Sequence, residues 1–130
     1  MKESKMIYRS TVVIGAMIVL LLTGVSCQSK SHVFGAPIDE KKGALVDMQK
    51  IFSHTDEYVG KNVIVQGATG QICLAAGCWL MLTDGSNQLF VQFYNFTARP
   101  PVRSAVRVQG VLKIQNRVPF IAAEGMEILR

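Results

Sequence analysis

Two cysteines, Cys73 and Cys78, have the clearest chemical potential in this 130-residue sequence. If residues 74–77 form a four-residue hairpin loop, the cysteines face each other across antiparallel strands, with Cα atoms about 4.5 to 5.5 Å apart. That separation lies within the usual disulfide range of about 4.4 to 6.8 Å. Because the loop is short, a disulfide there adds only about 2 kcal/mol to stability. One interpretation of the pair is therefore a local structural disulfide.

A metal site is the competing interpretation of the same two cysteines. Two thiolates held together by a hairpin can bind a soft ion such as Cu(I). Met81, Met126 or His54 could be auxiliary ligands, although His54 is also explained as a helix-end residue. Structural zinc needs four ligands, and beyond the two cysteines the domain offers only His54, with His32 in the tether. The ligand inventory favours Cu(I) over zinc.

Thiol redox exchange is a third possibility, although the C-x-x-x-x-C spacing differs from the C-x-x-C motif of thioredoxin-like enzymes. The sequence has no Ser/His/Asp set, no paired carboxylates in an evident apolar pocket and no glycine-rich phosphate loop. We therefore expect a binding module rather than an enzyme. A redox helper for the assembly of periplasmic cytochromes or metalloenzymes is the alternative, and so is a purely structural disulfide in a protein-interaction module.

The N-terminal 26 residues have the pattern of a bacterial secretory signal. Lys2, Lys5 and Arg9 precede an apolar run over residues 12–22, which is too short to span a membrane. Small residues then lead to Cys27, as they do at bacterial lipoprotein cleavage sites. We expect residues 1–26 to be removed and the Cys27 thiol to carry diacylglycerol, with further acylation by palmitate-like chains.

A lipid-modified Cys27 would attach the protein to a membrane of the cell envelope, facing the periplasm. Residues 27–32 are polar and read as a tether, which leaves residues 33–130 for one domain. Gln28 follows the cysteine where an aspartate would favour retention in the inner membrane. We therefore expect the outer membrane rather than the inner one.

The pattern of residues 33–130 predicts one short helix followed by five strands. Apolar residues at three- and four-residue spacing predict the helix over 45–54. Alternating β-branched and aromatic residues, punctuated by turn residues, predict strands over 61–72, 78–83, 88–93, 106–115 and 118–129, with a tight turn at Asn116 and Arg117. Five short strands with the longest link after the third are typical of the OB-fold, a small Greek-key barrel, whereas an immunoglobulin-like sandwich needs about seven.

Inward-facing residues of these strands should form the barrel core. The expected core comprises Val63, Val65, Leu80, Leu82, Val91, Val106, Val108, Leu112 and Ile121. Trp79 points to the opposite face of its strand from Cys78, and we expect it to fill the core or to cover one end of the barrel. Gly67 and Gly110 lie mid-strand, where a sharply coiled barrel needs bends or bulges.

The segment Cys73-Leu-Ala-Ala-Gly77-Cys78-Trp79 resembles the C-x-x-x-G-C-W signature of a family of exported bacterial OB-fold proteins, some of them called NrfJ-related. Phe34-Gly-Ala-Pro37 and Tyr58-Val-Gly-Lys-Asn-Val63 also fit, so the resemblance covers roughly residues 34–129. It implies an OB-fold and an exported location, with Gly77 and Trp79 as motif residues, but no defined reaction. The connection over 97–104, rich in proline and arginine, departs from the family pattern.

The charge distribution does not indicate nucleic-acid binding. The whole sequence has 14 basic and 9 acidic residues, and without the signal 11 and 8 would remain. This mild excess is dispersed, with Arg99, Arg103 and Arg107 as the closest grouping, and it suits a solvated surface. The expected partners are the membrane, through the lipid anchor, and an envelope protein.

Overall fold

The computed structural model describes residues 32–129. The expected signal peptide, the lipidation site at Cys27 and the tether up to residue 31 lie outside the described residues. Within residues 32–129, no helix has the length and apolar character needed to cross a membrane.

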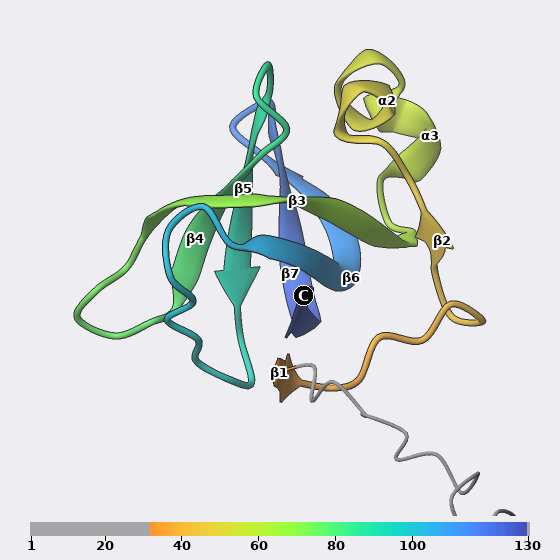
Figure 1. Ribbon diagram of the computed structural model, residues 1–130. Helices are drawn as coiled ribbons and strands as arrows, with labels where there is room; N and C mark the ends of the chain where they lie inside the picture. The colour runs from red at the N-terminus through yellow and green to blue at the C-terminus, as the bar shows by residue number, and fades with distance from the viewer. Residues whose placement is uncertain (1–31, 130) are drawn as a thin grey trace, which may run out of the picture.

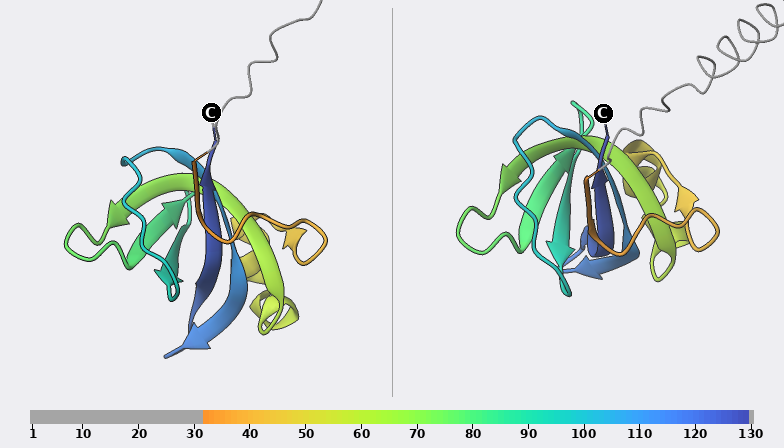
Figure 2. Two further views of the ribbon diagram at one scale, coloured as in Figure 1. Left: turned by 90° about the horizontal axis from the view of Figure 1, so that it is seen from below. Right: turned by 60° about the horizontal axis from the view of Figure 1, so that its bottom comes forward.

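Five strands close into a barrel (Figures 1 and 2). They are β3 (Asn62–Ile72), β4 (Trp79–Thr83), β5 (Gln88–Phe93), β6 (Ala105–Gln115) and β7 (Val118–Ile128). β3 pairs antiparallel with β4 and β6, β4 with β5, and β6 with β7, while a parallel pairing of β5 with β7 completes the ring. The predicted OB-fold-like barrel is confirmed, and every strand begins and ends within one residue of its expected bounds.

Two local features of β6 and β7 let these long strands coil. The turn between them places Asn116 at φ 52° and Arg117 at φ 66°, the left-handed pair that a two-residue hairpin requires. The register with β7 shifts between Gln109 and Gly110. A side chain at Gly110 would overlap the carbonyl oxygen of Ala122, so the bulge needs glycine.

The chain before the barrel differs from the sequence-based expectation. β1 (His32–Gly35) pairs antiparallel with β7, and the two-residue β2 (Ala44–Leu45) pairs in parallel with β3. His32 is therefore part of the sheet and not of the tether that the sequence predicts. Backbone pairing of such short strands leaves almost no periodic signal in a sequence.

The single helix expected over 45–54 is two shorter helices, α2 (Met48–Ser53) and α3 (Thr55–Tyr58). The helical region begins later than expected because Leu45 belongs to β2 and is 59% exposed. It is interrupted at His54, whose φ of −131° and ψ of 42° are not helical. Next to the break, the hydroxyl of Ser53 donates to the carbonyl of Gln49, as serine often does within a helix.

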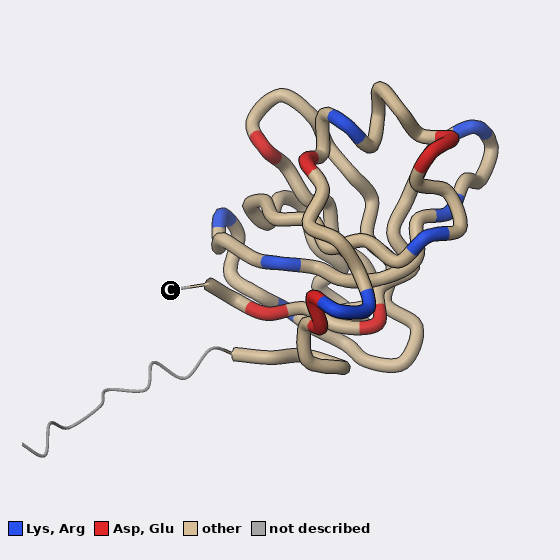
Figure 3. Tube along the Cα trace, turned by 90° about the vertical axis from the view of Figure 1, so that its right-hand side faces the viewer, with Lys and Arg blue, Asp and Glu red and all other residues tan. Residues whose placement is uncertain are grey.

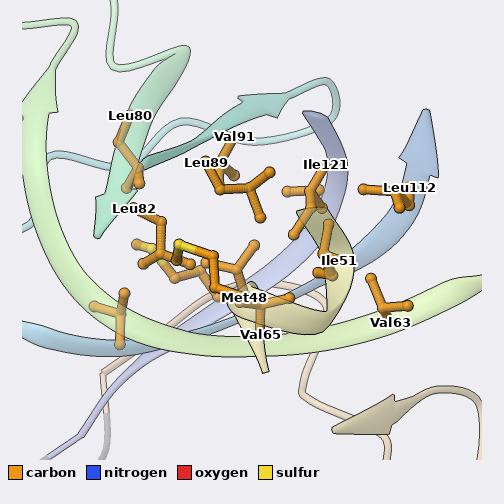
Figure 4. Packing of buried hydrophobic residues seen from close by; sticks show 14 of the residues in the cluster. Met48, Ile51, Val63, Val65, Leu80, Leu82, Leu89, Val91, Leu112 and Ile121 are labelled. Atoms are coloured by element: carbon orange, nitrogen blue, oxygen red, sulfur yellow. The ribbon is translucent and has the colours of Figure 1, made fainter. Parts of the chain in front are cut away.

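The core fills the barrel and continues onto α2 (Figure 4). Met48 and Ile51 point from the helix toward the barrel interior and are almost fully buried. All nine expected core residues are buried with at most 2% of their surface exposed, which confirms the predicted strand faces. The helix therefore closes one opening of the barrel with the apolar face that its spacing indicated.

Candidate functional site

The two cysteines lie at the two ends of the loop that joins β3 to β4. The amide of Cys73 donates to the carbonyl of Trp79 at 3.0 Å, and the amide of Gly77 donates to the carbonyl of Cys73 at 2.9 Å. Gly77 has a φ of 62°, a left-handed conformation that glycine adopts without steric cost. These bonds fold residues 74–77 back on themselves and bring Cys73 beside Cys78. We call residues 73–78 the cysteine loop.

The two sulfur atoms are within direct contact distance. Cys78 Sγ lies 3.6 Å from Cys73 Sγ, in the geometry of a thiol that donates to a sulfur acceptor. Both side chains are half-buried, whereas Leu74 at the tip of the loop is 77% exposed. A reagent or ion can therefore approach the pair from the loop side without opening the barrel.

The two thiols differ in acidity. The backbone amide of Ala76 is the largest cause that lowers the pKa of Cys73, and the amides of Cys78 and Gly77 and the Cys78 thiol act in the same direction, bringing it to about 7. The pKa of Cys78 is raised, chiefly because its proton is shared with Cys73. The pair therefore favours a state with a thiolate on Cys73 and a proton on Cys78.

The long connection between β5 and β6 fastens the cysteine loop from outside. The amide of Ala98 donates to the carbonyl of Gly77 at 2.9 Å. Arg99 spans the tip, with Nε 3.0 Å from the carbonyl of Leu74 and Nη2 2.9 Å from the carbonyl of Ala75. The sequence identified Arg99 only as part of a basic grouping, and no local pattern linked it to residues 25 positions away.

The expected auxiliary ligands do not form a compact set with the cysteines. His54 lies between α2 and α3, on the other side of the barrel from the cysteine loop, and its Nδ1 is 2.8 Å from Ser53 Oγ. Met126 is fully buried in the core. Met81 is half-buried on β4, on the face opposite that of Leu80 and Leu82. Within residues 32–129, no cluster of three or more His, Cys, Asp or Glu residues could hold a metal.

Trp79 lies outside the barrel core, so the expectation that it would fill the core is wrong. Leu80 and Leu82 occupy the inward positions of β4, so Trp79 faces outward and is half-buried. Its ring centroid is 5.7 Å from that of Phe90, which in turn lies 6.5 Å from that of Phe120. The motif tryptophan thus covers the outer face of the sheet next to the cysteine loop.

Charged residues are interspersed over the described part of the chain (Figure 3). Lys42 pairs with Glu124 at 2.6 Å, and Arg107 lies 3.6 Å from Glu40 and 3.8 Å from Glu127. Arg107, which the sequence grouped with Arg99 and Arg103, is therefore close to two carboxylates. The charge pattern of residues 32–129 presents mixed signs, which suits a solvated surface.

Comparisons with known proteins support the fold. No family model matches the chain, and no curated protein matches it in sequence. Among solved structures, a putative aspartyl-tRNA synthetase from Leishmania major Friedlin matches 88% of this chain with a TM-score of 0.57 and 12% identity. The hypothetical protein ygiW from E. coli matches 67% of this chain and 91% of its own, with a TM-score of 0.50 and 14% identity.

These similarities define the class of protein as an OB-fold-like barrel and nothing narrower. This chain spans only 25% of the length of the synthetase structure. At identities of 12% and 14%, the shared property is the fold. The cysteine loop must therefore be interpreted from its own geometry.

Proposed function

We propose that this protein is a membrane-tethered module of the cell envelope that binds a soft metal ion, Cu(I), through the thiolates of Cys73 and Cys78. The observation that carries the proposal is the 3.6 Å contact between two sulfur atoms, one of which is stabilised as a thiolate. Metal ligation by cysteine requires loss of the thiol proton. The pKa of Cys73 is about 7, so near neutral pH roughly half of the molecules already have a thiolate there and need lose only the Cys78 proton.

The choice of Cu(I) follows from the kind and number of ligands. Soft thiolate donors select Cu(I), zinc and iron–sulfur clusters, but zinc and iron–sulfur sites generally use four protein ligands. Within residues 32–129, the two cysteines have no third His, Cys, Asp or Glu in a common cluster. An ion that is satisfied by two or three soft ligands suits this pair best.

The sulfur separation also bears on how the ion would be held. Two sulfurs that lie 3.6 Å apart on one loop could both bind a single ion. With only two protein ligands, the ion could accept a further ligand from solvent or from a partner protein. Since residues 74–76 are exposed, such a partner could approach from the loop side. This geometry suits a module that passes its ion to another envelope protein.

The unequal acidity of the two thiols favours a second candidate function, thiol–disulfide exchange. The Cys73 thiolate would attack a partner disulfide, forming a mixed disulfide and releasing one partner thiolate. Cys78, after losing its proton to that thiolate, would attack Cys73 Sγ, form the Cys73–Cys78 disulfide and release the second partner sulfur as a thiolate. The pair would lose two electrons and the partner disulfide would gain them.

Mass spectrometry of the intact protein under native conditions tests the two candidates together. With reductant and Cu(I), we expect a mass increase of one copper ion, which is absent from Cys73→Ser/Cys78→Ser. Reduced protein that takes up no copper would refute the metal site. If the pair instead reacts with a small disulfide to lose two hydrogens, and a redox titration gives a potential above about −300 mV, exchange would be the better account.

A further inference from the structure

A tightly bonded turn in the connection between β5 and β6 presents Val102 and Arg103 to solvent. The amide of Ser104 closes the turn with a 3.2 Å hydrogen bond to the carbonyl oxygen of Pro101. The buried Thr69 holds it, because its hydroxyl donates to the carbonyl of Pro101 at 2.6 Å and its carbonyl accepts from the amide of Arg103 at 2.7 Å. Arg103 has a φ of 67°, where turns usually have glycine. The turn therefore keeps a strained arginine at its tip, next to a valine that is 59% exposed.

The tip of the cysteine loop has the same combination of side chains. Leu74 is 77% exposed, and the guanidinium of Arg99 bonds to two carbonyl oxygens of the loop. The loop and the connection lie side by side (Figures 1 and 2). In the described residues 32–129, neither Arg99 nor Arg103 is paired with a carboxylate. We call Leu74, Arg99, Val102 and Arg103 the arginine face.

The chain enters the domain near this face. β1 begins at His32, which pairs with Ile128 on β7, and Ile128 pairs in turn with Val106 on β6. The strand spacing therefore puts the Cα of His32 no more than about 20 Å from that of Arg103. Only four residues separate His32 from Cys27, and such a segment spans at most about 18 Å. A lipid on Cys27 would thus hold this side of the domain close to the bilayer.

We propose that the arginine face lies on the membrane that holds the lipid anchor, with its arginines against anionic phospholipid headgroups and its aliphatic side chains at the acyl-chain boundary. Guanidinium groups bind phosphate through paired N–H donors, and Arg99 uses only two of its five for the loop. Basic residues beside a lipid anchor add to its affinity for an anionic surface. The proposal rests on the membrane tether of the proposed function and not on the metal.

A second tip of similar composition separates the effect of position from that of composition. The turn between β6 and β7 presents Arg117 and Val118, both exposed. Val118 lies ten residues along β7 from Ile128, about 30 Å from the pairing with β1. Figure 2 shows this hairpin at the end of the barrel away from β1. An affinity for headgroups alone would act on both tips, whereas the short tether favours the arginine face.

Hydrogen–deuterium exchange of the mature lipidated protein in vesicles tests the proposal. The vesicles contain phosphatidylcholine alone or with about one third phosphatidylglycerol, which supplies the negative charge. The parent is compared with Arg99→Met/Arg103→Gly and with the matched variant Lys113→Met/Arg117→Gly on the far hairpin. Glycine suits both backbones, since Arg103 and Arg117 have φ values of 67° and 66°. Exchange in each variant is compared between the two vesicle types, so a local loss of stability cancels.

In the parent, we expect exchange over residues 74–76 and 102–104 to slow about threefold or more in the anionic vesicles, with residues 115–118 unchanged. The variant of the arginine face should lose this difference, and the hairpin variant should keep it. Equal exchange in the two vesicle types, equal slowing at both tips, or full protection in the variant of the arginine face would overturn the proposal.

A further variant, Leu74→Ser/Val102→Ser, separates a bilayer from an acidic protein as the occupant. Contact with a bilayer predicts that the loss of the two aliphatic side chains weakens the protection. Unchanged protection would mean that charge alone acts, as on an acidic protein, and would overturn the proposal. An intact mass without lipid would refute the tether on which the proposal rests. Failure of Cu(I) binding, in contrast, would bear only on the metal site.

Discussion

The amide of Ala98 donates to the carbonyl oxygen of Gly77 at 2.9 Å, so the connection between β5 and β6 is fastened to the cysteine loop. A Cβ at Gly77 would lie 3.1 Å from the carbonyl oxygen of Ala98 and 3.1 Å from Arg99 Cγ. The glycine of the motif thus has two roles, since it adopts a φ of 62° and it admits the close approach of the connection.

Gly77→Ala should therefore destabilise the protein more than a left-handed backbone alone explains. The left-handed conformation costs an alanine about 1 to 2 kcal/mol, and the tight contacts with Ala98 and Arg99 add to that cost. Gly60→Ala is the matched control, because Gly60 has a φ of 80° and no heavy atom within 4 Å of its added Cβ. Urea unfolding of both variants provides the measurement. Equal losses would show that the contact with the connection is unimportant.

Truncation of the barrel core gives a direct test of the strand faces. Leu82 is fully buried on β4, so Leu82→Ala should lower the free energy of unfolding by about 2 to 5 kcal/mol. Leu45, which is 59% exposed on β2, is the control, and Leu45→Ala should cost less than about 0.5 kcal/mol. Chemical denaturation followed by Trp79 fluorescence measures both. Similar losses at the two positions would contradict the assigned core.

The barrel could be predicted from the sequence because its strands combine a clear alternation with well-marked turns. Leu80 and Leu82 alternate with Trp79 and Met81, and that pattern fixes which face is buried. The same alternation puts Trp79 on the outer face, whereas the tryptophan was expected to fill the core or to cover one end of the barrel. The helix was harder, because the exposed Leu45 mimics helical spacing although it pairs with Ile64 in a short parallel bridge.

The candidate site could be predicted only in part. The spacing of Cys73 and Cys78 indicated that a loop would bring them together, and it does. The roles of Ala76 and Arg99 could not be predicted, because they depend on backbone orientation within the loop and on a contact between distant segments. The distance of His54 from the cysteines could not be predicted either, because nothing in the sequence around it shows which end of the barrel its helix occupies.

The stability of the reduced protein should depend on pH through the cysteine pair. The pKa of Cys73 is lowered from 9.0 to about 7 by backbone amides, so its contribution to the free energy of unfolding is absent below pH 7 and grows up to pH 9. The pKa of Cys78 is raised, so its contribution to the free energy of unfolding is lost as the pH rises above 9. The difference in unfolding midpoint between the parent and Cys73→Ser/Cys78→Ser should therefore rise from pH 7 to 9 and then fall. A difference that stays flat from pH 6 to 10, with reductant present throughout, would contradict this acidity pattern.

Lipidation at Cys27 is a prediction from the signal sequence alone. Metabolic labelling with a palmitate analogue should mark the parent protein in the membrane fraction, and Cys27→Ala should lose the label. Cys73→Ala is the control, because that cysteine belongs to the folded domain and should leave the labelling unchanged. Unlabelled parent protein recovered free in the periplasm would end the lipoprotein hypothesis.

An anaerobic competition titration shows whether Cys73 and Cys78 form one site for Cu(I). Reduced protein is titrated against a chromogenic Cu(I) chelator, alongside Cys73→Ser/Cys78→Ser and the single variant His54→Ala. We predict that the parent and His54→Ala remove one equivalent of Cu(I) from the chelator, because two thiolates fixed by one loop lose little conformational freedom on binding. The double variant should remove none. Competition by the parent no greater than that of the double variant would rule out a Cu(I) site at the two cysteines.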